Sequence, residues 1–325
     1  MKNFRFALCI VVCILLIVFS SNAASYARTG YDVFINSIFP SLLPFFVFTT
    51  LLRGSSFFEK SKSAFFVLAI ISGAPSAARL LKDVDLPSKK KTQLCAALNT
   101  ISPMFTISVL ATKELSSTSL ALPILIAQSI SIVIMLIPFY KTKISFSKQS
   151  RLSFAEAVSS SMNSMLSLCG TVVVFLVLIG IVSEFIPHKN NITVLFISGI
   201  AEVSSGCLGL GSLGVETRIL SSLGAFFVTF GGICVLMQSK TFFRIDSLRY
   251  IGFKFIQSTI TAILAYILTP LFYFEAKDVF NPVSQERLAE NATSMGTVLT
   301  VSMLVIFAII LLGIAYRSIT NPRKR

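Results

Sequence analysis

Ten apolar segments, each long enough to cross the hydrocarbon core of a bilayer as a helix, occupy most of the chain. A transmembrane helix needs about 20 mainly apolar residues. The segments lie at about 6–24, 34–52, 64–81, 92–112, 118–139, 165–186, 192–213, 218–237, 251–274 and 295–316. The sequence is 54% hydrophobic and only 13% charged, and a soluble protein of this composition would expose large apolar patches. We therefore predict an all-α polytopic membrane protein whose first partner is the lipid bilayer.

Two of these segments are interrupted by residues that do not suit a straight helix. The first interruption, within residues 63–83, reads Ser72-Gly73-Ala74-Pro75-Ser76. The second, within residues 192–214, contains Gly199, Glu202, Ser204, Ser205 and Gly206. Proline removes a helix donor and glycine permits a sharp turn. Half of such a segment reaches only the bilayer midplane, so each is either a kinked span or a re-entrant hairpin.

The basic residues between the segments favour the hairpins. If all ten segments crossed the membrane from an inside N-terminus, the loop with Arg79 and Lys89 to Lys91 would lie outside, against the positive-inside rule. If the interrupted segments are hairpins, every sizeable basic loop and the tail Arg323-Lys324-Arg325 lie inside, and the acidic loop from Glu275 to Glu290 lies outside. We predict about eight spans and two hairpins, with both termini cytoplasmic. This topology explains the net charge of +14 without a nucleic-acid partner.

The predicted topology divides the chain into four parts. Residues 1–30 form an N-terminal membrane helix, which we favour over a cleaved signal peptide because its apolar run is long. Residues 31–140 and 155–274 each contain a span, a hairpin, an interrupted span and a further span. Residues 275–325 contain the acidic loop, the last membrane helix and the basic tail. Three crossings per unit reverse the second unit in the membrane, so the two units are predicted to be inverted repeats.

Inverted repeats with broken helices are typical of transporters, whose sites lie near the midplane where the breaks meet. The break in the first unit reads Asn99-Thr100-Ile101-Ser102-Pro103, and the break in the second reads Thr229-Phe230-Gly231-Gly232. A site for a small polar solute is predicted from hairpin and break residues: Gly73, Pro75, Ser76, Asn99, Ser102, Glu202, Ser204, Ser205, Gly231, Gly232 and Gln238. Close packing of helices is the alternative explanation for the small and hydroxyl residues among them.

Glu202 is the most informative single residue. An ionisable group within a membrane segment costs about 2.5–3.5 kcal/mol and usually faces a cavity or a partner. Glu202 would bind a coupling proton or sodium ion, or accept a hydrogen bond from the solute. The alternative is a glutamate near the hairpin tip that reaches the outer aqueous phase. No catalytic triad or zinc-ligand pattern accompanies it, so we expect neither an enzyme nor a cofactor.

Several stretches resemble the YlbJ-type sporulation integral membrane proteins. Phe39-Pro40-Ser41-Leu42-Leu43-Pro44-Phe45-Phe46 is similar to the opening signature of that family. Gly73-Ala74-Pro75-Ser76-Ala77-Ala78 resembles its Gly-x-Pro hairpin, and Asn99 to Pro103 resembles its Asn-x-Ser-x-Pro-like break, although the family often doubles the asparagine. Glu202 and the run from Gly231 to Gln238 resemble the acidic residue and the Gly-Gly motif of its second half.

The resemblance covers residues from about 30 to 275 and implies a multi-pass protein of a bacterial cell membrane. It implies gate domains of the nucleoside-recognition type, shared with nucleoside transporters, and a role in spore formation. The expected function is then to bind or move a small polar solute, nucleoside-like or other. A structural membrane protein of sporulation that transports nothing is the alternative. The sequence leaves a homo-oligomer open.

Overall fold

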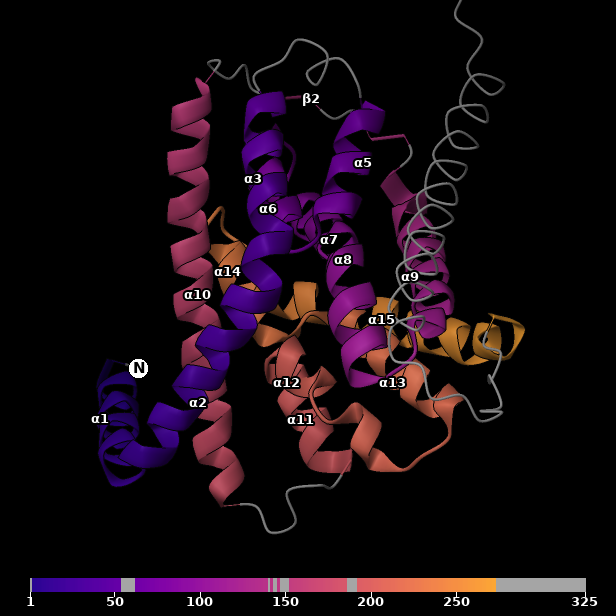
Figure 1. The fold of residues 1–325 in the computed structure, drawn as a ribbon. Helices are drawn as coiled ribbons and strands as arrows, with labels where there is room; N and C mark the ends of the chain where they lie inside the picture. The colour runs from indigo at the N-terminus through magenta and orange to yellow at the C-terminus, as the bar shows by residue number, and fades with distance from the viewer. Residues whose placement is uncertain are drawn as a thin grey trace, which may run out of the picture.

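The computed structural model describes residues 2–53, 62–139, 141–142, 145–146, 152–185 and 192–272 (Figure 1). The described part before residue 150 contains α1 (Lys2–Val18), α2 (Ser20–Val33), η1 (Phe34–Ile38), α3 (Phe39–Arg53), α5 (Lys62–Ser72), α6 (Ser76–Leu81), β1 (Val84–Asp85), α7 (Ser88–Leu98), α8 (Pro103–Phe105), η2 (Thr106–Glu114), η3 (Thr118–Leu120), α9 (Ala121–Leu136), η4 (Ile137–Phe139) and β2 (Ser145–Phe146). The part after residue 150 contains α10 (Phe154–Glu184), α11 (Ile192–Ala201), α12 (Val203–Cys207), η5 (Leu210–Leu213), α13 (Thr217–Phe230), α14 (Gly232–Lys240) and α15 (Ser247–Phe272).

The described helices are long and apolar enough for several membrane crossings. Five stretches qualify by length and composition: Ser88–Glu114, Thr118–Phe139, Phe154–Glu184, Thr217–Lys240 and Ser247–Phe272. A sixth is added if α1 and α2 are taken together. The prediction of an all-α, multi-pass membrane protein is therefore confirmed. The predicted last helix within 275–325 lies outside the described residues.

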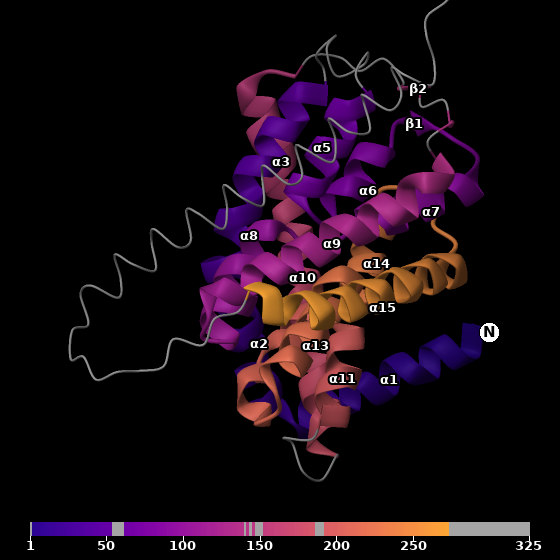
Figure 2. The same cartoon turned by 90° about the vertical axis from the view of Figure 1, so that its right-hand side faces the viewer.

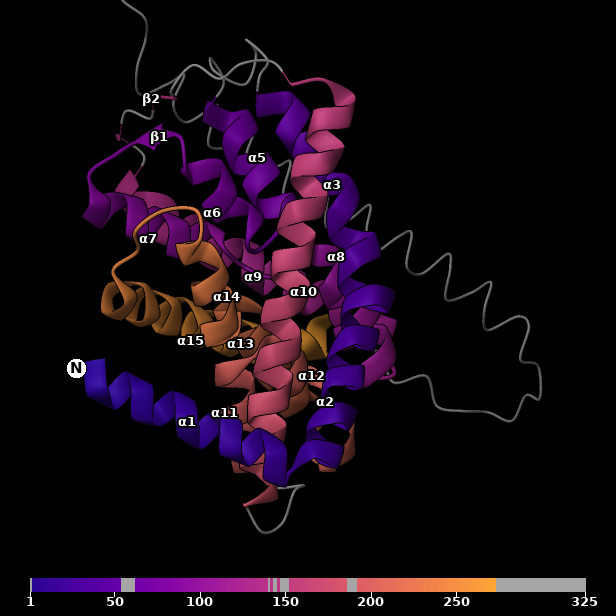
Figure 3. The ribbon, with the colours of Figure 1, turned by 90° about the vertical axis from the view of Figure 1, so that its left-hand side faces the viewer.

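The N-terminal helix differs from the predicted segment 6–24. The chain bends by 96° at Phe19, between α1 and α2. The predicted division at residue 30 falls inside α2, which continues through η1 into α3 and packs along α10 (Figure 3). Tyr26 explains this packing, because its ring lies against Gly180 and its hydroxyl donates to the Glu184 carboxylate at 3.2 Å. Since Phe19 lies inside the apolar segment 6–24, hydropathy alone does not reveal the bend.

The first interrupted segment folds back on itself. Helix α5 begins at the end of the molecule that holds β1 and β2, and α6 turns back after Gly73, Ala74 and Pro75 (Figures 1 and 2). Gly73 has φ +67°, a conformation that L side chains rarely adopt. The amide of Ala74 donates to the Thr100 carbonyl at 2.6 Å. The hairpin tip is thereby joined to the break of its own unit.

The second interrupted segment enters from the opposite end of the molecule (Figure 1). Glu202 separates α11 from α12, and η5 leads away from the tip. The amide of Gly209 donates to the Glu114 carboxylate at 3.1 Å, so the exit of this hairpin lies beside the end of η2. The tip meets the second break, because an added Cβ at Gly232 would lie 2.9 Å from the Ala201 carbonyl oxygen.

Three stretches between the apolar segments lie side by side near β1 and β2; we call this region the basic end and define it by residues 82–91, 141–142, 145–146 and 240–246. Strands β1 and β2 pair antiparallel, with Val84 opposite Phe146. The Lys91 ammonium lies 5.0 Å from the ring centroid of Phe243, and the Asp246 amide donates to the Thr92 hydroxyl at 3.4 Å. These contacts bring three stretches that are far apart in the sequence to one place.

The two helix breaks cross at the centre of the molecule. The Ile101 amide donates to the Val228 carbonyl at 2.8 Å, and Gln128 of α9 donates to the carbonyls of both residues at 3.3 and 3.4 Å. The side chains of α15 complete this arrangement, since Lys254 donates to the Thr229 carbonyl and Gln257 to the Ala97 carbonyl. These bonds satisfy, inside the protein, one amide and several carbonyls at the two breaks, where a bilayer core supplies no water.

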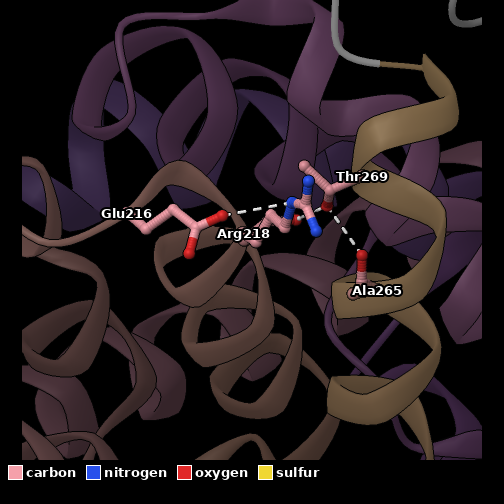
Figure 4. Close-up of polar contacts among 5 residues, drawn as sticks. Glu216, Arg218, Ala265 and Thr269 are labelled. Atoms are coloured by element: carbon pink, nitrogen blue, oxygen red, sulfur yellow. Dashed lines mark hydrogen bonds and ion pairs between the residues drawn. The ribbon is translucent and has the colours of Figure 1, made fainter.

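Helix α15 is held to α13 at its other end as well. The hydroxyl of Thr269 donates to the Ala265 carbonyl at 2.6 Å and is hydrogen-bonded to the Ser221 hydroxyl of α13 at 2.8 Å (Figure 4). Arg218 and Glu216 form an exposed ion pair at 3.1 Å where α13 begins. Helix α15 packs against α13 of the second unit and against α9 and α7 of the first, and Thr261 donates to Ser131 of α9 at 2.8 Å (Figure 2).

Candidate functional site

A cavity of about 40 Å³ lies where the tips of the two hairpins approach the helix breaks. Its polar lining comes from four predicted site residues, Ser102, Glu202, Ser204 and Gln238. The remaining lining is apolar and includes Ile38 of η1 and Phe105 of α8. A cavity of this size holds a few water molecules or one partly hydrated ion. It is too small for a solute of nucleoside size.

Glu202 is the residue at which the second hairpin turns. It has an extended backbone, with φ −148° and ψ 129°, and begins α12 as its N-cap. Its carboxylate accepts the Ser205 amide at 2.9 Å. The residue is only 2% exposed, so its side chain faces the cavity and not the aqueous phase beyond the hairpin. Of the two interpretations drawn from the sequence, the burial favours a residue directed at a cavity.

Ser102 is the capping residue at the first break. It caps α8, and its hydroxyl accepts the Phe105 amide at 3.4 Å. Gly73 permits this position, because an added Cβ would lie 2.5 Å from the Ser102 nitrogen. Each hairpin tip therefore packs against the break of its own unit. Beside each contact lies an N-cap residue, Ser102 or Glu202, whose side chain lines the cavity.

The other predicted site residues are not all brought to the cavity. Pro75 lines a second, larger pocket. The lining of the central cavity does not include Gly73, Ser76, Asn99, Ser205, Gly231 or Gly232. Gly231 and Gly232 instead form the second break, with φ of +77° and +80°.

Asn99 has a structural position. It is completely buried, and its side-chain amide donates to the Ser239 hydroxyl at 2.8 Å and to the Tyr250 hydroxyl at 2.9 Å. These bonds join the first break to α14 and to α15. The hydrogen-bond donors of Asn99 are thus used inside the protein, which leaves its carbonyl oxygen without a partner among the described residues.

The larger pocket has a volume of about 700 Å³ and lies between α3, α6, α10 and α14, close to the basic end. Gln238 and Leu168 line both this pocket and the central cavity, so the two are neighbours. One side of the pocket is a polar stripe on α10, at a spacing that places every member on one face: Glu156, Ser160, Asn163, Ser164 and Ser167. A polar face on a spanning helix requires contact with water or with a polar ligand.

Two buried cations are not evident from sequence reasoning. Arg79 falls in a predicted basic loop, but it lies in α6, is 6% exposed and lines the larger pocket. Lys254 is completely buried in α15. Its position inside the apolar segment 251–274 is a signal that could have found it, since charges within spans are rare. Arg79 carries a weaker form of the same signal, because it lies near the end of the apolar segment 64–81 and its burial depends on the α6 turn.

No family model, curated protein or solved structure matches this chain. The resemblance to YlbJ-type proteins stays a prediction from short motifs.

Proposed function

We propose that this chain is a transporter-like membrane protein that binds a small polar solute between two inverted units. The observation that carries the proposal is the buried Glu202 at a hairpin tip, in a cavity that adjoins a large polar pocket. An intramembrane carboxylate beside two helix breaks is the arrangement expected of a coupled transporter.

The order of elements supports two related units. In residues 31–140, α3 precedes the hairpin α5–α6, the broken helix α7–α8–η2 and then α9. In residues 155–274, α10 precedes the hairpin α11–α12, the broken helix α13–α14 and then α15. The hairpins enter from opposite ends, as an inverted relation demands (Figure 1). We propose about eight spans in the whole chain on this basis.

The volumes of the two cavities suggest that they bind different ligands. The larger pocket has the volume of a typical small-molecule site, whereas the central cavity suits an ion or a proton carrier. In the proposed cycle the solute enters the larger pocket, and Glu202 binds a proton or sodium ion. One unit then rocks against the other and exposes the site on the opposite side.

The basic loops orient the proposed cycle. Lys82 lines the larger pocket, and under the positive-inside rule this supports our proposal that the pocket opens to the cytoplasm. A bacterial cell membrane, cytoplasmic termini and a link to spore formation extend the proposal, and they rest on loop charges and on the motif resemblance.

Transport can be tested with a mixture of candidate solutes. Proteoliposomes containing the full chain are loaded with small metabolites and salts, and the retained compounds are measured by mass spectrometry. The native protein is expected to release one or a few compounds. Glu202→Gln keeps an oxygen that can accept the Ser205 amide but removes the negative charge. If that charge contributes about 1.4 kcal/mol or more to the rate-limiting step, the variant should release solute at least about tenfold more slowly.

Glu216→Gln is the matched control, because Glu216 is exposed and paired with Arg218 away from both cavities. It should release solute at the native rate. A structural protein of sporulation would retain every compound in all three preparations, and that result would rule out transport.

A further inference from the structure

The larger pocket contains one deeply buried cation, Arg79 of α6. Its guanidinium is fixed on two sides. One terminal nitrogen donates to the Ser160 hydroxyl of α10 at 3.0 Å, and the guanidinium carbon lies 5.1 Å from the ring centroid of Phe46 in α3. These contacts hold the planar group between three helices and restrict its rotation.

The other terminal nitrogen of Arg79, Nη1, is buried and has no hydrogen-bond partner among the described residues. Leaving a buried charged donor unpaired is costly, so native proteins rarely do it without a reason. Since Arg79 lines the pocket, a bound ligand is a direct way to satisfy that nitrogen. Arginine presents its donors as a planar fork that matches the oxygens of a carboxylate or a phosphate.

Three other charged side chains line the pocket, namely Lys82, Asp83 and Glu156. Glu156 is exposed and accepts the amide and hydroxyl of Ser153 at 2.7 and 2.8 Å in the cap of α10. Lys82 is exposed, and Asp83 is partly exposed. Arg79 alone among the four is buried, so a ligand in the pocket's interior meets a positive charge, with the neutral hydroxyls and amide of α10 around it.

We propose that the larger pocket binds its ligand through an anionic group, a carboxylate or a phosphate, held by Arg79. This inference rests on the proposed function and names the substrate class as small organic anions. Ser160 supplies a neutral polar contact beside the anion. A neutral nucleoside does not fit this class, whereas a phosphorylated or carboxylated solute does.

The test uses Asn163→Cys in the full chain, because Asn163 is exposed and lines the pocket. The protein is placed in phosphatidylcholine nanodiscs, and modification by N-ethylmaleimide, a neutral reagent, is followed at that site by mass spectrometry. Inorganic phosphate or malonate should slow the modification in a saturable way. Chloride at equal ionic strength should leave the rate unchanged.

Adding Arg79→Gln should weaken the protection at least about tenfold, because a charge-assisted hydrogen bond is lost. Arg249→Gln is the matched control, since Arg249 pairs with Asp246 outside the pocket, and should keep the native protection. If Arg79→Gln does not fold, the proposal is judged by whether phosphate or malonate protects Asn163→Cys in the protein that keeps Arg79. No protection by phosphate or malonate, or equal protection by chloride, overturns the proposal.

Nanodiscs that also contain phosphatidylglycerol distinguish binding of a free anionic solute from binding of an anionic lipid headgroup. Slower modification with this lipid, and no effect of either free anion, would assign Arg79 to a headgroup and overturn the solute proposal. The outcome is independent of transport itself. Proteoliposomes that release a compound while Asn163→Cys is unprotected by anions would retain the proposed function and remove only its substrate class.

Discussion

The Gly73→Ala variant is expected to lose about 2–5 kcal/mol of stability, the largest effect of any single methyl group that we predict for this chain. Two costs combine in this figure. Gly73 has φ +67°, where an L side chain is strained by about 1–2 kcal/mol. The added Cβ would also lie 2.5 Å from the Ser102 nitrogen and 2.6 Å from its Cα, and backbone atoms cannot rotate away. Overpacking of this kind typically costs about 1–3 kcal/mol.

Gly252→Ala provides the control for Gly73→Ala. Gly252 lies inside α15, and no atom lies within 4 Å of an added Cβ. Alanine is the better helix former by about 0.5–1 kcal/mol, so this variant should be as stable as the native protein or slightly more so. Melting temperatures in detergent, and protein levels in membranes, measure both variants. Equal melting of the two variants would contradict the close contact between the first hairpin tip and Ser102.

Asn99→Leu is expected to lower stability by about 1–3 kcal/mol. The substitution removes the bonds to Ser239 and Tyr250 and leaves their hydroxyls without this donor inside the protein. The range allows for the modest value of hydrogen bonds between membrane helices. The variant should melt earlier, and any loss of solute release should accompany that loss of stability.

Asn36→Leu is the matched control for Asn99→Leu, because Asn36 is exposed in η1. Its stability should change by no more than about 0.5 kcal/mol. The opposite pattern for Asn99→Leu, normal melting with no solute release, would restore Asn99 as a direct ligand of the solute, the role predicted from the sequence.

Helical content and the positions of the interrupted segments were predictable from the sequence, because apolar length, glycine, proline and loop charge are local signals. Glu202 was predictable as well, since a lone carboxylate in an apolar segment is conspicuous. The bend at Phe19 was not predictable in this way. It depends on contacts between α2 and α10, which are far apart in sequence.

The roles within the candidate site were harder to predict, because they depend on which atoms meet. Asn99 and Ser102 lie in one short break, yet Asn99 bonds to α14 and α15 while Ser102 lines the cavity. Arg79 lies near the end of the apolar segment 64–81, and the α6 turn is what buries it. The cavity volumes, about 40 and 700 Å³, also come only from packing, and they change the expected occupant of the centre from a solute to an ion.

Two hairpins are proposed to enter from opposite ends of the protein and to meet at a site that opens to each side of the membrane in turn. The accessibility of single cysteines from the two sides of a membrane tests this proposal. Right-side-out and inverted vesicles are treated with a membrane-impermeant maleimide, and modification is measured at each site by mass spectrometry. Lys90→Cys and Arg244→Cys, both exposed at the basic end, should react from one side, and Lys113→Cys, exposed in the last turn of η2, from the other.

Ser204→Cys, in the central cavity, is the decisive position. We expect it to react from both sides, more slowly than the exposed positions because the site must open first. Modification of Lys90→Cys and Arg244→Cys from opposite sides would show that the second interrupted segment spans the membrane. Modification of Ser204→Cys from one side only would contradict alternating access.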